Sequence, residues 1–184
     1  VSNIKLEETE REFLKFEEIQ QLSLTLPEDV IDQQVAKMFL FSCFTGLSIA
    51  NLLSLTYKQI ENDTVKFFRE KTKTWQYQPL SKTALALIGD TANCPPDTKV
   101  FTTLDYRQCR YRLQKWGKQA GIQKTLNFHL GRHTFATLSL TQGVDVFTVQ
   151  KLIGHKKIAT TQIYAKVIDS VKRKAVDALP QLEL

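Results

Sequence analysis

The side chains best suited to phosphate chemistry lie between residues 129 and 164. They are His129, Arg132, His133, His155 and Tyr164, and they include every histidine of the 184-residue chain. Imidazole and guanidinium groups bind phosphate oxygens, and a phenol oxygen becomes a nucleophile when a base removes its proton. Together these residue types are the parts of a metal-free phosphoryl-transfer site.

A helix predicted over residues 129–142 brings two of these side chains together. His129 and Arg132 stand at positions i and i+3, which lie on the same helical face. A first-turn position for His129 adds the positive end of the helix dipole and unpaired backbone N–H groups, both of which favour an anion. One bound phosphate can then touch both side chains.

The second pair, His155 and Tyr164, requires a break in the helix. Nine residues of straight helix would separate the two by ~13 Å, which is too far for them to share one phosphate. Gly154 supplies a break, and a helix that restarts near Ala159 would allow Tyr164 to return to the phosphate.

These motifs resemble those of the tyrosine recombinases, the site-specific integrases and resolvases that use a tyrosine nucleophile. The matching segments are Thr45-Gly46-Leu47, His129-x-x-Arg132-His133-Thr134-Phe135-Ala136-Thr137, Leu152-Ile153-Gly154-His155 and Tyr164. The resemblance extends from about Phe13 to Leu179, and several spaced motifs in the right order make it specific. It implies an integrase of a phage or conjugative element. The expected fold is that of the DNA breaking-rejoining enzymes, mainly α with a small antiparallel β-sheet at one edge.

The resemblance also implies a reaction. Tyr164 would attack a DNA phosphorus, form a 3′-phosphotyrosine link and release a 5′-hydroxyl. A free phenol has a pKa of ~10, so the attack needs a base and cationic surroundings at neutral pH. His129 is the candidate base, whereas Arg132 and His155 would hold the phosphate oxygens. The link conserves bond energy, so neither a metal, ATP nor another cofactor is expected.

One position departs from the family pattern. An arginine that clamps the phosphate usually follows Gly-Leu, whereas this chain has Ser48 after Gly46-Leu47. Loss of one preorganised donor to a developing oxyanion typically lowers the rate by about 10²–10³. Either another cation takes its place, or the domain is impaired, or the serine was introduced by engineering. Some integrases of mobile elements are similar in lacking this arginine.

A predicted β-hairpin supplies further cations. Residues 64–69 and 75–80 are rich in β-branched and aromatic side chains and are expected to pair as strands. The family carries a lysine general acid in such a hairpin, and Lys71 fits that role best, with Lys73 as its rival. Alternation places Arg69 on the same face as Lys71, so Arg69 is a candidate for the missing clamp. The alternative for Arg69 is an ordinary surface cation.

Charge is distributed unevenly along the chain. Residues 1–70 carry 7 basic and 12 acidic side chains, whereas residues 71–182 carry 18 basic and 6 acidic ones, for a net charge of +12. Such an excess favours a polyanion, above all double-stranded DNA. The alternative is a solvated basic surface that aids solubility.

A helix predicted over residues 105–118 presents part of this charge. Its buried face repeats at helical spacing and consists of Cys109, Leu113, Trp116 and Ala120. The neighbouring stripe consists of Arg107, Arg110, Gln114 and Lys118. This stripe suits the phosphates of a groove, and Lys73 and Lys156 are further candidate DNA contacts. The alternative for the stripe is a solvated polar face.

The other patterns complete the expected domain. Helices are predicted over residues 16–24, 28–43 and 81–88, and a short third strand at Val100-Phe101. Residues 1–12 are acidic and polar, and we expect a linker from an N-terminal DNA-binding domain that is absent here. Residues 13–184 would form the catalytic domain.

Residues 168–184 are expected to form a C-terminal helix and tail. In the family the corresponding helix often packs on a neighbouring protomer, although folding back on its own core is the alternative. Recombination of this type implies a homo-oligomer of four protomers on two DNA duplexes.

The sequence shows neither a membrane-spanning segment nor a secretion signal, and this bears on where the protein is located in the cell. No apolar run reaches the roughly 18 residues needed to span a membrane, and no secretion signal is visible. Cys43, Cys94 and Cys109 are odd in number and show no pairing pattern, which favours a reducing compartment. We expect a cytoplasmic, DNA-associated bacterial protein.

Three other interpretations compete with the recombinase. His129 and His133 stand at i and i+4 and could be two zinc ligands, although His133 also suits a packed core. A metal-dependent nuclease would need clustered carboxylates, and residues 71–182 contain no glutamate. A helical DNA-binding module without catalysis is supported by Ser48, and it would not need Tyr164.

Overall fold

The computed structural model describes residues 12–69, 73–89, 91, 93–101, 104–154, 169, 172–173 and 176–180, with only the backbone of Arg69. The helices are α1 (Phe16–Leu24), α2 (Val30–Thr45), α3 (Ile49–Ser54), η1 (Tyr57–Gln59), α4 (Lys82–Ile88), α5 (Tyr106–Gln119), α6 (Phe128–Thr141) and α7 (Val146–Ile153). The strands are β1 (Ile60–Glu61), β2 (Thr64–Arg69) and β3 (Thr74–Pro79). The prediction of a mainly helical fold with a small antiparallel sheet is therefore confirmed.

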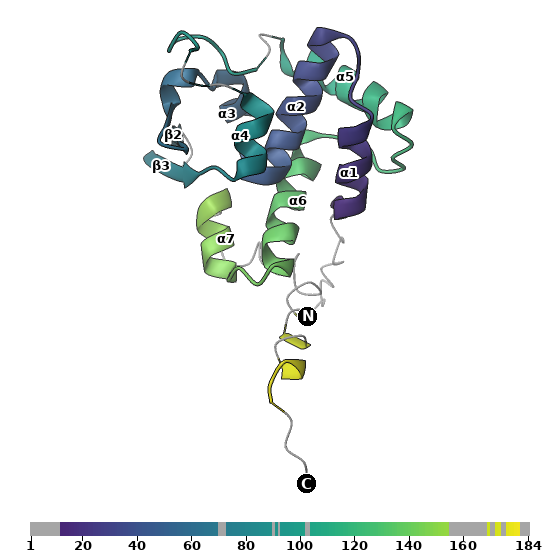
Figure 1. Cartoon of the computed structure of the whole chain (residues 1–184), viewed down its shortest axis with the longest axis vertical. Helices are drawn as coiled ribbons and strands as arrows, with labels where there is room; N and C mark the ends of the chain where they lie inside the picture. Colours follow the sequence, from purple (N-terminus) through teal and green to yellow (C-terminus); the bar gives the residue numbers. More distant parts are fainter. Residues whose placement is uncertain are drawn as a thin grey trace, which may run out of the picture.

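Helix α2 runs through the middle of the molecule. Asp29 caps its N-terminus by accepting hydrogen bonds from the backbone N–H groups of Ile31 (3.0 Å) and Asp32 (2.8 Å). Gly46 ends it in the left-handed conformation with φ +66°, which glycine adopts without strain. Figure 1 shows α1 and α5 on one side of α2, with α4 and the strands on the other. Contacts with α4, α5 and α6 fix all three helices to this central element.

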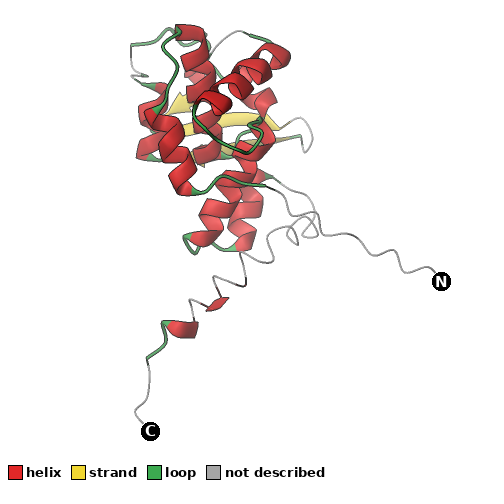
Figure 2. Ribbon diagram, turned by 90° about the vertical axis from the view of Figure 1, so that its right-hand side faces the viewer, coloured by secondary structure: helices red, strands yellow, loops and turns green. Residues whose placement is uncertain are grey.

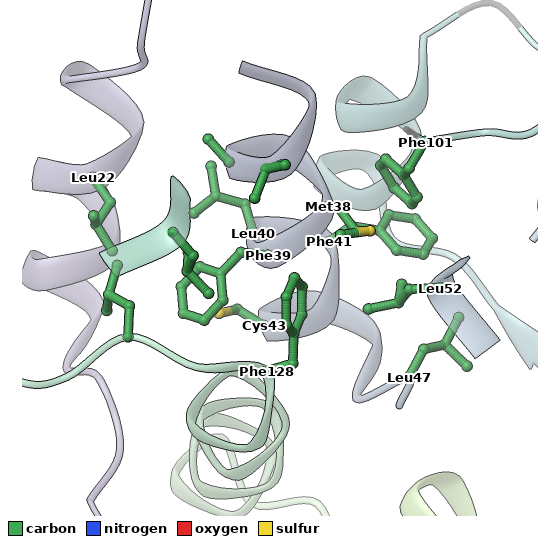
Figure 3. Packing of buried hydrophobic residues seen from close by; sticks show 14 of the residues in the cluster. Leu22, Met38, Phe39, Leu40, Phe41, Cys43, Leu47, Leu52, Phe101 and Phe128 are labelled. Carbon is green, nitrogen blue, oxygen red and sulfur yellow. The ribbon is translucent and has the colours of Figure 1, made fainter. Parts of the chain in front are cut away.

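Aromatic side chains of α2 form the core on both of its sides. The Phe39 ring meets Trp116 edge-on at a centroid distance of 6.2 Å and Phe128 at 6.1 Å. Phe41 points the other way and packs on Phe101 at 5.3 Å. Figure 3 shows the four phenylalanine rings among leucines of the same cluster. Because a single helix supplies both layers, its end has a fixed position relative to the sheet and to α6.

The sheet has the order β1-β2-β3, and every pair is antiparallel. Figure 2 shows its strands in yellow beside the helices. Val65 and Phe67 of β2 are buried, whereas Trp75 and Tyr77 of β3 are exposed, so the sheet has an inner and an outer face. Arg69 follows Val65 and Phe67 along β2 at a spacing of two residues.

Most predicted elements agree with the structure within two residues, and one is wrong. Val100-Phe101 is not a strand, because this segment contributes only a single bridge, Lys99 to Thr56, and a hydrogen bond from the Val100 N–H to the Leu55 carbonyl (3.0 Å). The third strand is β1 instead. Phe101 is buried because its ring packs on Phe41.

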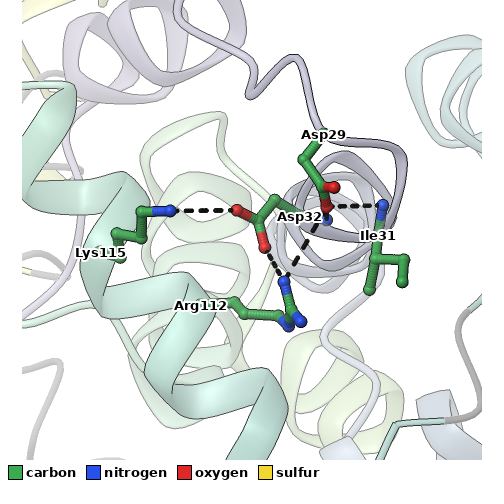
Figure 4. A network of polar contacts seen from close by, with 5 residues as sticks. All are labelled: Asp29, Ile31, Asp32, Arg112 and Lys115. Carbon is green, nitrogen blue, oxygen red and sulfur yellow. Dashed lines mark hydrogen bonds and ion pairs between the residues drawn. The ribbon is translucent and has the colours of Figure 1, made fainter.

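Two cations of α5 form internal ion pairs. Arg112 hydrogen-bonds to Asp32 on α2, and Lys115 lies 3.6 Å from the same carboxylate (Figure 4). The hydrogen bond to Asp32 raises the pKa of Arg112. These contacts help to hold α5 against α2. Within the described part of the chain, no helix is long and apolar enough to cross a bilayer.

Candidate active site

The guanidinium of Arg132 connects three separate segments of the chain. It extends from α6 and donates through Nη1 to the Gly46 carbonyl at 2.8 Å and through Nη2 to the Ile153 carbonyl. Gly46 caps the C-terminus of α2, and Ile153 is the last residue of α7. Helix C-termini carry partial negative charge and unpaired carbonyls, so both ends favour a cation here.

The turn at Gly46 is tightly packed. A Cβ atom at this position would lie 2.5 Å from Cδ1 of Phe135 and 3.2 Å from Cγ2 of Ile153. The Gly46 turn, the segment that carries Arg132 and the end of α7 are therefore in direct contact. The structure thus brings together three motifs that are far apart in the sequence.

His129 lies in the first turn of α6, as predicted. Asn127 caps this helix by accepting a hydrogen bond from the Leu130 N–H at 2.9 Å. His129 is exposed and shares its helix with Arg132 at i and i+3. This is the geometry that allows an anion to meet both the helix end and the two side chains.

His133 has a different environment from His129. Its side chain is only 8% exposed, and its ring centroid lies 6.3 Å from that of His129. Burial agrees with the interpretation of His133 as a packed core residue. Among the residues with described positions, no group of three or more histidine, cysteine, aspartate or glutamate side chains is arranged to hold a metal ion.

Ser48 has a local structural role. It caps α3, where its Oγ accepts a hydrogen bond from the Asn51 N–H at 3.4 Å and lies 2.6 Å from Asn51 Oδ1. The position two residues beyond Gly46 is therefore beside the turn that contacts Arg132, but it carries a neutral hydroxyl.

The inner face of the sheet reaches the same turn through Gln78. This residue pairs with Val65 and is 4% exposed, and its Nε2 donates to the Thr45 carbonyl at 2.5 Å. Gln78 was not among the predicted site residues, although its position in the predicted strand at residues 75–80 indicates that it can face inward. The connection places β2 and β3 beside the end of α2.

Several predicted site residues are not covered by the structure. Lys71, His155, Lys156 and Tyr164 lie outside the described residues, as does the side chain of Arg69. Lys73 is exposed in the hairpin turn with φ +53°. The predicted break at Gly154 is confirmed, because this residue ends α7 with φ +66°.

The stripe on α5 faces solvent. Arg107, Arg110 and Lys118 are exposed, and Gln114 is partly buried. At 100° per residue Arg112 lies on the side of α5 away from the stripe, and Lys115, one turn before Lys118, lies between the two. Tyr111 is 72% exposed on the same side as the stripe, and the sequence analysis did not single it out.

The buried cysteines are poor alternatives to a tyrosine nucleophile. Burial raises the pKa of the Cys43 thiol far above its ordinary value. Burial is also the main reason that the pKa of Cys109 is raised to about 11. Because the thiolate is the reactive form, both groups are inert at neutral pH.

Comparison with known proteins assigns the family. Residues 12–170 match the family model described as the phage integrase family. The chain belongs to the phage integrase family. Tyrosine recombinase XerA of Saccharolobus solfataricus is 37% identical over 139 residues, which are 73% of this integrase-family chain and 47% of the relative. Tyrosine recombinase XerC of Shewanella amazonensis is 31% identical over 172 residues, which are 81% and 57% of the two chains. The integrase-family chain thus spans about half the length of these relatives.

Solved structures share the fold. A crystal structure of XerA recombinase gives a TM-score of 0.73 at 23% identity and covers 95% of this chain and 68% of that one. The catalytic domain of bacteriophage HP1 integrase gives a TM-score of 0.68 at 20% identity, and the match covers 92% of this chain and 95% of that one. XerH site-specific recombinase, bound to palindromic difH substrate, gives a TM-score of 0.71 at 18% identity, and the match covers 92% of this chain and 53% of that one. The expected recombinase catalytic-domain fold is confirmed.

The packing at Gly46 can be tested by substitution. Gly46→Ala should destabilise the domain more than Gly143→Ala, because both positions have positive φ but an added Cβ at Gly143 meets nothing within 4 Å. We expect a loss of about 1–2 kcal/mol at Gly143 from backbone strain alone. Overpacking against Phe135 should add about 1–3 kcal/mol at Gly46. Urea unfolding measures both, and equal losses would show that Phe135 moves aside without cost.

Proposed function

We propose that this chain is the catalytic domain of a site-specific DNA recombinase that cuts and rejoins strands through a 3′-phosphotyrosine intermediate. The observation that carries the proposal is the position of Arg132, where the Gly46 turn, α6 and the end of α7 meet. Membership of the phage integrase family supports it. In this proposal residues 13–184 are the catalytic domain, and residues 1–12 lead from a DNA-binding domain.

The proposed reaction is a transesterification at phosphorus. The Tyr164 oxygen forms a bond to phosphorus as the bond to the DNA 5′-oxygen breaks. His129 takes the phenol proton, and Lys71 protonates the departing oxygen, with Lys73 as the rival acid. Arg132 and His155 bind the non-bridging oxygens, whose charge grows in the transition state. Attack by the free 5′-hydroxyl of a second strand reverses these steps and releases Tyr164.

The chain between Ile153 and His155 supports this assignment. His155 follows Ile153 by two residues, so covalent geometry alone limits the distance between their Cα atoms to about 7 Å. The carbonyl of Ile153 accepts a hydrogen bond from Arg132. We therefore keep His155 as the second proposed ligand of the phosphate.

The proposed partners are double-stranded DNA and further copies of the chain. The net charge of +12 over residues 71–182 and the exposed stripe on α5 suit a DNA backbone. Lys73 and Lys156 would add phosphate contacts. The complete reaction would use four protomers on two duplexes, with residues 168–184 packing on a neighbour.

A covalent adduct tests the nucleophile. Incubation with nicked or supercoiled target-site DNA in EDTA should give a protein–DNA adduct that resists SDS and maps to Tyr164. Tyr164→Phe should abolish the adduct and retain DNA binding, because only the nucleophilic oxygen is lost. An adduct that persists in Tyr164→Phe, or that needs a divalent metal, would contradict the mechanism.

A non-catalytic DNA-binding module is the second candidate. It is favoured by Ser48, whose hydroxyl caps α3 and brings no charge to the phosphate site. The adduct experiment separates the two functions, since a binding module would hold DNA equally well with tyrosine or phenylalanine at position 164 and would form no adduct.

Arg69 is our proposed substitute for the missing arginine. It follows the buried Val65 and Phe67 of β2 at the same two-residue spacing, and Gln78, which pairs with Val65, binds the Thr45 carbonyl beside the Gly46 turn. Arg69→Ala should lower the cleavage rate by about 10²–10³, as for a lost oxyanion donor, while DNA binding is nearly unchanged. Ser48→Arg should restore part of the loss. Equal cleavage rates for Arg69→Ala and the parent protein would show that Arg69 is not the substitute cation.

The stripe on α5 offers a matched pair of charge removals. Arg110→Gln should weaken DNA binding and reduce the slope of log K against log salt by about 1. Arg112→Gln removes the same charge from the same helix but breaks the ion pair with Asp32. It should lower the free energy of unfolding and leave the salt slope nearly unchanged. Equal slope changes for Arg112→Gln and Arg110→Gln would show that DNA affinity depends on net charge alone.

A further inference from the structure

We propose that Gln78 is a positioning residue for Arg132, acting through the last two carbonyl groups at the end of α2. The inference rests on the proposed function where it concerns DNA cleavage. Its structural part, the dependence of Arg132 on Gln78, stands on contacts alone.

Gln78 and Arg132 bind consecutive carbonyl groups. Nε2 of Gln78 donates to the Thr45 carbonyl at 2.5 Å, and Nη1 of Arg132 donates to the next carbonyl, that of Gly46, at 2.8 Å. A carbonyl oxygen only accepts hydrogen bonds, so the NH₂ group of the amide must face Thr45. Two successive peptide groups at the end of α2 are therefore held from different sides, the Thr45–Gly46 peptide from the sheet and the Gly46–Leu47 peptide from α6.

The buried amide of Gln78 satisfies the Thr45 carbonyl but leaves its own oxygen unpaired. Gln78 Oε1 is inaccessible to solvent and has no hydrogen-bond partner, one of only two such side-chain atoms in the part of the chain that the structure describes. A buried acceptor without a donor destabilises a fold relative to an apolar side chain of similar shape. Methionine would fill the same space without an unpaired Oε1 but would not bind the Thr45 carbonyl, so we assign the amide to the position of that carbonyl.

Gln76 provides a matched control on the same strand and the same face. It pairs with Phe67, two residues before Gln78, and is partly buried. Its Nε2 donates to Thr74 Oγ1 at 3.3 Å and to the Trp75 carbonyl at 3.1 Å, so these hydrogen bonds remain within its own strand. It makes no hydrogen bond to the end of α2 among those described.

The consequence concerns the geometry of catalysis. Without Gln78 the Thr45–Gly46 peptide keeps only the hydrogen bond from the Gly46 N–H to the Ser42 carbonyl (2.8 Å), and a small tilt of this peptide displaces the adjoining Gly46 carbonyl that orients Arg132. A misplacement of about 1 Å caused by a change away from the reacting atoms can lower a rate by about 10²-fold. Binding of DNA depends on many phosphate contacts and is much less sensitive to this displacement.

The first test compares Gln78→Met with Gln76→Met in the full chain. With nicked DNA under single-turnover conditions, Gln78→Met should form the phosphotyrosine adduct about 10–100-fold more slowly than the parent. DNA affinity should be unchanged, and the Tm should change little, because the substitution removes the unpaired Gln78 Oε1 but leaves the Thr45 carbonyl without its donor. Gln76→Met should match the parent rate. A lower Tm with an unchanged rate for Gln78→Met would show a purely structural role and overturn the proposal.

A second measurement needs no DNA and no activity. In protein labelled with ¹⁵N-arginine, the side-chain N–H signal of Arg132 is identified by its loss in Arg132→Lys. This signal should shift and exchange faster with water in Gln78→Met but not in Gln76→Met. An unchanged signal in Gln78→Met would overturn the proposal. A shifted signal, together with a parent protein that forms no adduct, would instead refute the recombinase function and leave the positioning role in place.

Discussion

The arrangement of this domain depends on one cation at two helix ends. Arg132 hydrogen-bonds to the carbonyls of Gly46 and Ile153, which lie at the C-termini of α2 and α7. A planar guanidinium can donate in two fixed directions at once, which the compact ammonium of lysine cannot reproduce. The orientation of α7 relative to α2 is therefore coupled to the orientation of the side chain that we assign to the phosphate.

The same two contacts bear on the missing arginine. Each helix C-terminus carries a partial negative charge, so both reduce the positive potential that Arg132 presents to an anion. In the usual family pattern a second arginine would add to this potential from the position of Ser48. Here Ser48 is neutral and caps α3, so a phosphate site at this place needs a cation from elsewhere. Because of this electrostatic requirement, we propose that the hairpin of β2 and β3 supplies the cation.

Local signals predicted the elements, and long-range polar contacts escaped prediction. The helix at residues 16–24 and the strand at 64–69 follow from spacing and composition, and Ser81 marks the start of α4 as an N-cap. Val100-Phe101 has the composition of a strand, but its neighbours offer only one bridge. The bond from Gln78 to Thr45 spans 33 positions in the sequence. No periodicity encodes such a contact, because it depends on how the sheet packs on the end of α2.

The charges of α5 show why net charge is an incomplete guide to DNA binding. Arg112 and Lys115 pair with Asp32 and hold α5 to α2, whereas Arg107, Arg110 and Lys118 are exposed. A charge count assigns all five residues to one basic surface. The first pair lies beside two carboxylates, those of Asp29 and Asp32, which offset its charge. The second group contributes more of the positive potential that a phosphate backbone meets in the solvent.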